Sequence, residues 1–388
     1  MPRSPLFGRR IHIGGSIPLV IAHAPTDEVR AARAFVADLT RQLLKRGATF
    51  VVPVDAEKRR DVDGEPICFD WLIWQTIKDN LHLRPADAPA PVAVAVQHHK
   101  TEAQIPQEFQ PLWDELRLSD HVKIENAAHW NMNSKRMEAQ ARWGDILVAL
   151  GGSEGVLYLA NLYHDAGKPV VPLNFPICAA GTGARHIFEY GLTSSNTHRL
   201  FRTAEGLDPH GWLNRINFTA RSSTSERAAA AVALLEALER PTAFVVRLLN
   251  PKHADFTEVD NYFASVVQPV IEGELGYKLV VVDGKQPYEF PRIDQEIFEK
   301  LHRGALIVAD LTGSRPNCFL ELGYALGRAI PTMVLAREDT QHPFDITTLA
   351  GHHWVSTLTV EEKRRQLREH WIAVRRRPPI VSAEPLIP

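Results

Sequence analysis

Apolar runs of strand length alternate with helical patterns along this chain of 388 residues, and the alternation occurs in two series. The predicted strands lie at 10–16, 49–55, 92–97, 144–152 and 169–174 in the first series, and at 243–250, 277–284 and 305–309 in the second. Strands separated by helices pair in parallel, because a helical crossover returns the chain to the same edge of the sheet. The sequence therefore predicts an α/β protein with two Rossmann-like (flavodoxin-like) domains, each with a mainly parallel sheet flanked by helices.

The predicted helices place the boundary between the two domains. A helix over 27–46 ends at Gly47, a residue type favoured at helix ends. A helix over 222–239 begins with a serine or threonine cap, has a glutamate soon after it, and is ended by Pro241. We therefore predict domains at 1–240 and 241–388, with residues 180–240 closing the first domain as helices.

The composition is typical of a soluble globular protein and excludes several classes of partner. The formal net charge is −2, which offers no strong basic field for a nucleic-acid backbone. The three cysteines, Cys68, Cys178 and Cys318, are widely spaced and odd in number, which argues against a disulfide framework or a zinc cluster. The sequence shows neither an apolar run of signal-peptide length at its start nor a membrane-spanning run later. We expect a cytoplasmic protein with no membrane partner.

The stretch 304–335 joins a buried strand to a helix that begins with one carboxylate. The apolar run Ala305–Ala309 ends at Asp310, turn residues follow, and Glu321 lies in the first turns of the helix. Parallel sheets place ligands outside the carboxyl ends of their strands, so we expect Asp310 and Glu321 to face the same crevice. A carboxylate there suits chemistry on a sugar, because a glycosidic bond breaks through an oxocarbenium-like state. An acidic residue in a first helical turn also stabilises the helix without chemistry, and this alternative stays open.

Two further polar residues follow strands of the second series. Asn250 ends the run at 243–250, and Asp283 follows the valines of the run at 277–284. Both are candidate substrate-binding residues, because the loops that follow these strands border the same crevice. Asp283 precedes a glycine, so a turn explains it nearly as well.

The stretch 304–335 resembles the superfamily that contains TIR-like domains and nucleoside 2-deoxyribosyltransferases. Its pattern is a strand, the letters ADLTG, a polar loop with PN and a helix reading ELGYA, found here at Ala309–Gly313, Pro316, Asn317 and Glu321–Ala325. The resemblance implies that Glu321 attacks or stabilises the anomeric carbon of a sugar. It also implies that Asp310 and Asn317 are binding residues.

The likeness extends over most of residues 242–354. It includes a late HPFDI loop at His342–Ile346. Many relatives read MPF after their first strand, where this chain has Leu249, Asn250 and Pro251. This loop borders the predicted crevice, so the departure bears on the identity of the substrate.

Two glycine-rich turns follow strands of the first series and form a candidate nucleotide-binding site. They comprise Gly14, Gly15 and Ser16 in one turn and Gly151, Gly152, Ser153, Glu154 and Gly155 in the other. Glycine lets the backbone approach phosphates closely, and free N–H groups at a helix start favour anions. If the two strands are neighbours, both turns lie at one nucleotide. Tight strand-to-helix turns need glycine anyway, so either turn alone is weak evidence.

These turns resemble the SLOG superfamily, which includes the Lonely-guy phosphoribohydrolases and Smf/DprA-like proteins. The residues that carry the likeness are IGGS at Ile13–Ser16 and DILVALGGSEGV at Asp145–Val156. The enzymatic branch has a catalytic glutamate on the next helix, whereas this helix has no acidic residue before Asp165. The resemblance therefore implies that the first domain binds a nucleotide without hydrolysing it. Glu154 either contacts a ribose or base or caps the helix.

Together these features predict a nucleotide-signal-regulated hydrolase that cleaves the N-glycosidic bond of NAD in antiphage defence. In bacterial antiphage systems, sensor-type SLOG domains control attached NAD-consuming domains. NAD is then the substrate, and we expect no cofactor and no metal. The histidine pairs at 98–99 and 352–353 lack the spacing of a helical zinc site.

The expected partners are a small nucleotide ligand, a nucleotide substrate and further copies of the chain, because neighbouring subunits often complete TIR-like sites. Two alternatives stay open. One is a nucleoside 2-deoxyribosyltransferase or nucleotide N-glycosidase. The other is a non-catalytic nucleotide sensor or scaffold.

Overall fold

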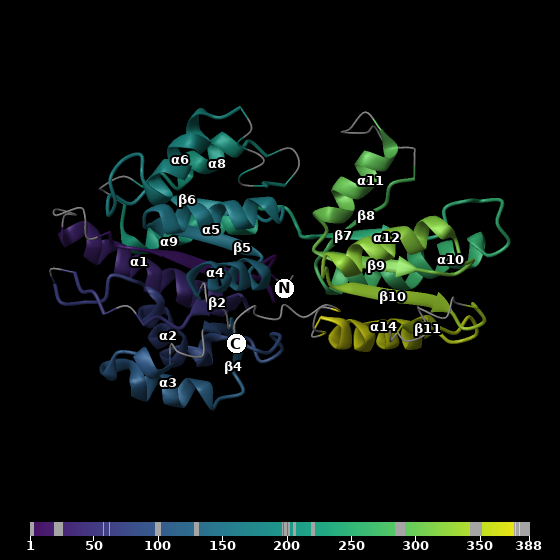
Figure 1. The fold of residues 1–388 in the computed structure, drawn as a ribbon, viewed down its shortest axis with the longest axis horizontal. Helices are drawn as coiled ribbons and strands as arrows, with labels where there is room; N and C mark the ends of the chain where they lie inside the picture. Colours follow the sequence, from purple (N-terminus) through teal and green to yellow (C-terminus); the bar gives the residue numbers. More distant parts are fainter. Residues whose placement is uncertain are drawn as a thin grey trace. The chain divides into compact units, whose positions relative to one another are not determined.

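The computed structural model describes residues 4–380 except 19–25, 57, 62, 98–101, 128–131, 196, 198–199, 201, 205–206, 219–221, 284–291, 342–350, 376 and 378–379. The chain forms two compact units, and the second begins at Arg240 (Figure 1).

The first unit is built on a six-stranded sheet in the order β4-β3-β2-β1-β5-β6, and all its strand pairings are parallel. The strands are β1 (Arg10–Ser16), β2 (Thr49–Pro53), β3 (Ala93–Gln97), β4 (Val122–Asn126), β5 (Ile146–Gly151) and β6 (Val170–Leu173). The order of the strands reverses between β1 and β5. Open α/β sheets bind ligands at such a switch point, outside the carboxyl ends of the strands.

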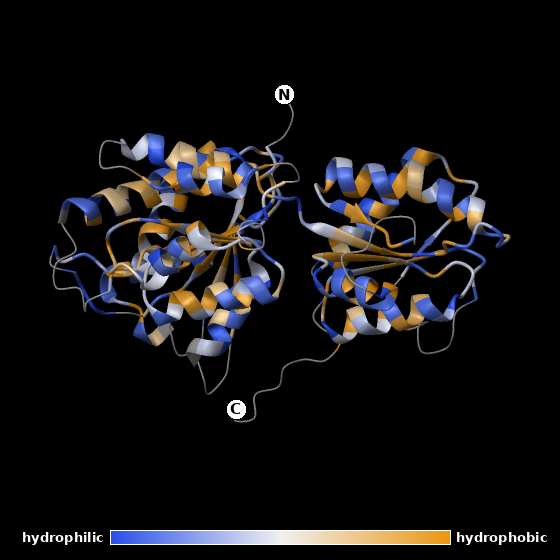
Figure 2. Cartoon of the chain, turned by 90° about the horizontal axis from the view of Figure 1, so that it is seen from above, coloured by the Kyte–Doolittle hydropathy of each residue, from blue (hydrophilic) through white to orange (hydrophobic). Residues whose placement is uncertain are grey.

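Helices flank this sheet, and Figure 2 shows mostly hydrophobic strands between helices that carry both hydrophilic and hydrophobic residues. The helices are α1 (Thr26–Lys45), α2 (Asp70–Asp79), α3 (Gln110–Arg117), α4 (Met132–Trp143), α5 (Glu154–Asp165), α6 (Gly183–Thr193), α8 (Pro209–Arg215) and α9 (Thr224–Glu236). Short 3-10 turns lie at Leu81–Leu83, Glu102–Gln104 and Gln107–Phe109. Helix α9 begins with a capping box in which Ser223 and Glu226 each accept a hydrogen bond from the other's backbone N–H, as the sequence predicted.

The second unit has a five-stranded parallel sheet in the order β11-β10-β9-β7-β8. Its strands are β7 (Thr242–Val246), β8 (Lys278–Val280), β9 (Leu306–Asp310), β10 (Thr332–Arg337) and β11 (His352–Trp354). Its helices are α10 (Phe256–Tyr262), α11 (Ile293–His302), α12 (Pro316–Gly327) and α14 (Val360–Val374), with wide π-helical turns at Phe263–Val267 and Pro269–Glu274. This is the flavodoxin-like order, and its switch point lies between β7 and β9.

Alternate residues of β9 enter two different cores. Leu306 and Val308 pack with residues of α10 and α14, whereas Ile307 and Ala309 pack with residues of α11 and α12. Successive side chains of a strand point to opposite faces, so this sheet is covered by helices on both sides. The predicted fold class, two α/β units with mainly parallel sheets flanked by helices, is confirmed.

Several elements were not predicted from the sequence. The edge strand β4 reads VKIEN and is half-exposed, so it lacks the apolar run of a buried strand. Helices α2 and α3 were also not predicted, whereas α6, α8 and α9 lie in the range 180–240 that was predicted to be helical. Helix α10 is followed by π-helical turns, which lie around Pro269, a residue with no N–H to donate.

Candidate functional site

Glu321 lies in the second turn of α12, at the border of the face that packs on the sheet. The helix begins with Pro316, whose fixed backbone angle suits a first helical position. Cys318, Leu322 and Ala325 are the buried residues of this helix and face the core. Glu321 follows Cys318 by three residues, so its side chain lies beside this buried face rather than on the outer one.

The Glu321 carboxylate is half-buried and makes no hydrogen bond or ion pair within the part of the chain that the structure describes. Burial raises the pKa of Glu321 from 4.5 to about 7. Burial and the nearby charges of Glu321 and Asp310 raise the pKa of the Cys318 thiol to about 12. Glu321 is therefore a carboxylate with a perturbed pKa and no structural partner among the described residues, which is typical of functional sites.

Asp310 ends β9 and is fully buried. Its Oδ1 accepts a hydrogen bond from the Thr312 N–H at 3.0 Å, and its Oδ2 accepts one from Trp354 Nε1 at 2.9 Å. Burial raises its pKa, while these two hydrogen bonds lower it. Trp354 belongs to the core shared with α10 and α14, whereas α12 covers the other face. The Asp310 side chain therefore points to the face opposite α12, although its charge and that of Glu321 both act on Cys318. A crevice shared by the two carboxylates stays a prediction.

The other predicted residues of the second domain lie beyond the carboxyl ends of its strands. Asn317 is exposed in the first turn of α12, and Asp283 is half-buried just after β8. Asn250 is exposed in the loop after β7, where its side-chain oxygen accepts a hydrogen bond from the Lys252 N–H at 3.0 Å. This bond fixes a local turn. Substrate binding by Asn250, Asp283, Asp310 and Asn317 stays a prediction.

An arginine ties the loops of this edge together. Arg337 ends β10 and donates to Asp255 Oδ1 at 2.7 Å and to Glu258 Oε2 at 2.5 Å. Its backbone N–H donates to Thr312 Oγ1 at 2.9 Å. The loops that follow β7, β9 and β10 are therefore held by one set of hydrogen bonds.

In the first unit, the two glycine turns lie side by side at the switch point. Gly15 and Ser16 of β1 pair with Leu150 and Gly151 of β5, and the Gly152 N–H donates to the Ser16 carbonyl at 2.7 Å. A Cβ on Gly15 would lie 1.7 Å from the Leu150 carbonyl oxygen. Close backbone approach therefore requires this glycine even without a ligand.

A third element closes on these turns. Gly183, the first residue of α6, has φ +50°, and a Cβ there would lie 2.3 Å from the Gly151 carbonyl oxygen and 2.2 Å from that of Gly152. No local sequence signal marks Gly183 as part of this site, because the loop after β6 is far from both turns in the chain.

The start of α5 is open. Ser153, Glu154 and Gly155 are exposed, and the N-cap residue Ser153 makes no side-chain capping hydrogen bond. Glu154 likewise makes no hydrogen bond within the described residues. The first N–H groups of this helix thus have no side-chain cap, which suits an anion. Binding of a nucleotide by these turns stays a prediction.

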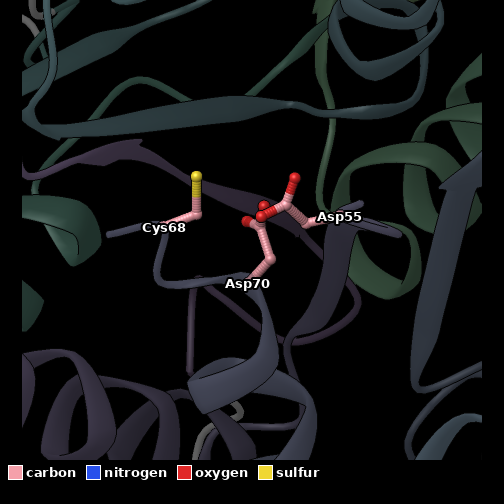
Figure 3. Close-up of side chains that lie close together, drawn as sticks. All are labelled: Asp55, Cys68 and Asp70. Carbon is pink, nitrogen blue, oxygen red and sulfur yellow. The ribbon is translucent and has the colours of Figure 1, made fainter. Parts of the chain in front are cut away.

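Next to the first glycine turn, two carboxylates and a thiol converge. Asp55 follows β2, Asp70 begins α2, and Cys68 pairs with Ser16 in an isolated β-bridge. One ligand atom from each of the three lies within 4.8 Å of the others. Figure 3 shows the two carboxylates turned toward each other, with the thiol beside them. All three cysteines of the chain are free thiols.

Both aspartates are almost fully buried. Burial and the charge of Asp55 raise the pKa of Asp70 well above its usual range, while Arg136 opposes this shift. Two buried like charges are relieved by a proton or by a cation, so this group is also a place that could hold a metal ion. Neither aspartate was predicted as a site residue, although Asp55 ends a predicted strand and Asp70 begins a periodic apolar run.

Some predicted features lie outside the described residues. These are the histidine pair at 98–99 and the HPFDI loop at 342–346. Within the described residues, the structure has no helix that combines the length and the apolar character needed to cross a bilayer.

The two mainly parallel sheets flanked by helices define a Rossmann-like α/β protein. The chain belongs to the Cap17-like ATP nucleosidase family, because the family model described as "ATP nucleosidase Cap17-like, N-terminal" matches residues 6–235. The match covers the sheet of the first unit and fits the resemblance of this unit to SLOG domains. It does not reach the TIR-like stretch of the second unit.

Among solved structures, the X-ray structure of TM1055, a structural genomics target, is similar at 20% identity with a TM-score of 0.30. The alignment covers 50% of this chain and 89% of that one. A search of curated proteins finds no match.

Proposed function

We propose that this protein hydrolyses the N-glycosidic bond of a nucleotide and that Glu321 acts at the sugar carbon. The observation that carries this proposal is the half-buried Glu321 carboxylate, which has no partner among the described residues and a pKa raised to about 7 by burial. Burying this carboxylate lowers the stability of the fold, and the carboxylate makes no stabilising contact among the described residues. Selection for chemistry therefore explains it best.

The chemistry follows from the charge of this carboxylate. As the base leaves, positive charge develops on the sugar carbon and its ring oxygen. An ionised Glu321 stabilises that charge or forms a covalent adduct, which water then hydrolyses. The TIR-like resemblance supports this role for Glu321. In this proposal Asn250, Asp283 and Asn317 position the substrate, and the buried Asp310 does so by ordering the loop that leads to α12.

Two substrates are candidates, and different observations favour them. The name of the family favours ATP, with adenine as the leaving base. The TIR-like resemblance of the second domain favours NAD, with nicotinamide as the leaving base. Both contain a ribose linked to nitrogen, so the same carboxylate serves either reaction.

The first domain is proposed as the nucleotide-binding regulator of this activity. Its two turns, together with the open start of α5, form an anion-binding edge. In this proposal a nucleotide signal binds there, in a cytoplasmic homo-oligomer that acts in defence against phage.

The test is to incubate the full-length chain with ATP, NAD and deoxynucleosides and to measure released bases by chromatography. Glu321→Gln should lower release at least about 100-fold, as expected for loss of a group that stabilises transition-state charge. Glu361→Gln, an equivalent change at a largely exposed glutamate of α14, should leave the rate unchanged.

Base release by Glu321→Gln at the parental rate would refute the role of Glu321. Exchange of one base for another, rather than release, would show a transferase. Absence of any product with nucleotide binding intact, in the presence of candidate cyclic nucleotides, would favour a sensor or scaffold.

A further inference from the structure

His253 lies at the switch point of the second unit, in the loop after β7, with its side chain 31% exposed. Its ring packs on Gly313 in the loop after β9, where a Cβ would lie 3.0 Å from His253 Cε1. Gly313 has φ +80°, so glycine is required here both for the backbone conformation and for the ring above it. The ring is therefore held against the loop that leads to Glu321.

The surroundings of the ring determine where its proton lies. The Asp255 N–H donates to His253 Nδ1 at 3.3 Å, so the neutral ring carries its proton on Nε2. Nε2 makes no hydrogen bond within the described part of the chain. Asp255 Oδ2 lies 3.5 Å from Nδ1, within ion-pairing distance of a charged ring. In both forms the Nε2–H remains available to a ligand.

The two candidate leaving bases differ in whether they need a proton from such a donor. A purine leaves with the electrons of the glycosidic bond and needs a proton, because a purine anion is a poor leaving group. Nicotinamide leaves from a pyridinium as a neutral molecule and needs no proton. A proton donor at this edge is therefore useful for one substrate class and superfluous for the other.

Resting on the proposed function, we infer that His253 donates the proton to a departing purine and so directs the site toward purine nucleotides. The loop after β9 separates the two groups in the chain: Gly313, beneath His253, lies before α12, and Glu321 lies within it. His253 then protonates the leaving base, while Glu321 stabilises the charge on the sugar.

The step balances. The C1′–N9 bond breaks and its electron pair goes to the purine, which takes the Nε2 proton of the protonated His253. Water adds to C1′, and the proton that it releases passes to Glu321. When both residues re-equilibrate with solvent, the net reaction is the nucleotide plus water giving free purine and the ribose phosphate.

The test compares the parent with His253→Gln and His253→Ala in the full-length chain, with adenine release from ATP and nicotinamide release from NAD as readouts. Loss of a general acid lowers the rate about 100-fold or more. We expect that loss for adenine release in both variants, partial recovery of His253→Ala with added imidazole, and any parental nicotinamide release retained within about threefold. His164→Gln, a change at an exposed histidine of α5, should match the parent.

Three results would overturn this inference while the proposed function stands: no loss of adenine release, equal losses of both bases without imidazole recovery, or a parent that releases nicotinamide but no adenine. A parent that releases neither base under any condition refutes the proposed function itself. Thermal unfolding of each variant shows whether a loss of rate reflects misfolding.

Discussion

Trp354 donates its indole N–H to Asp310 Oδ2 across 2.9 Å, which joins the ends of β11 and β9 over the intervening strand β10. The same indole stacks on Tyr262 with ring centroids 4.4 Å apart. Asp310 also accepts the N–H of Thr312 at the start of the next loop. This aspartate thus orders the loop that leads to α12, whatever part it has in substrate binding.

Trp354→Phe should destabilise the second unit by about 1–3 kcal/mol beyond the loss of size, because it leaves a buried carboxylate oxygen unpaired. Trp371→Phe is the matched control, since Trp371 is nearly buried in the same core and its indole N–H makes no hydrogen bond among the described residues. Denaturant unfolding of both variants measures the difference. Equal destabilisation would show that the hydrogen bond contributes nothing.

Glu321→Gln should raise stability at pH 8 and leave it unchanged at pH 4. The folded-state pKa of Glu321 is raised from 4.5 to about 7, so the carboxylate lowers stability as the pH rises through that window. Each pKa unit corresponds to ~1.4 kcal/mol, and partial exposure reduces the expected gain to about 1–2 kcal/mol. Denaturant unfolding at the two pH values measures it, and a loss of stability at pH 8 would contradict the assignment.

We expect the buried pair Asp55 and Asp70 to make the stability of the first unit depend on pH in a similar way. Because the pKa of Asp70 is raised in the folded state, its contribution to stability is present below pH 4 and is lost as the pH rises. Asp70→Asn should therefore raise the unfolding midpoint at neutral pH but not at pH 3.5. If added divalent cations stabilise the parent and not the variant, a cation rather than a proton relieves the pair.

Gly183→Ala should destabilise the first unit by more than about 2 kcal/mol, because the new methyl would overlap the Gly151 and Gly152 carbonyl oxygens. Gly181→Ala is the control, since Gly181 has φ +73° and nothing within 4 Å of its Cβ position. That change should cost only about 1 kcal/mol for the backbone conformation. Thermal unfolding compares the two, and equal losses would show that the close approach is not needed.

The sequence by itself determined those elements that depend on residues close together in the chain. The strand β5 and helix α9 follow from apolar runs, a glycine turn and a capping box, all of which act between residues close in the chain. The placement of Glu321 at the start of a helix after a buried strand was predicted for the same reason.

The tertiary structure decided which distant residues meet. The alternation of side chains along β9 turns Asp310 away from the face that α12 covers, although the two are close in sequence. Asp55 and Asp70 meet because the end of β2 and the start of α2 lie at one edge of the sheet, and His253 meets Gly313 because β7 and β9 are neighbours. Strand order and helix packing set these contacts, and no local pattern encodes them.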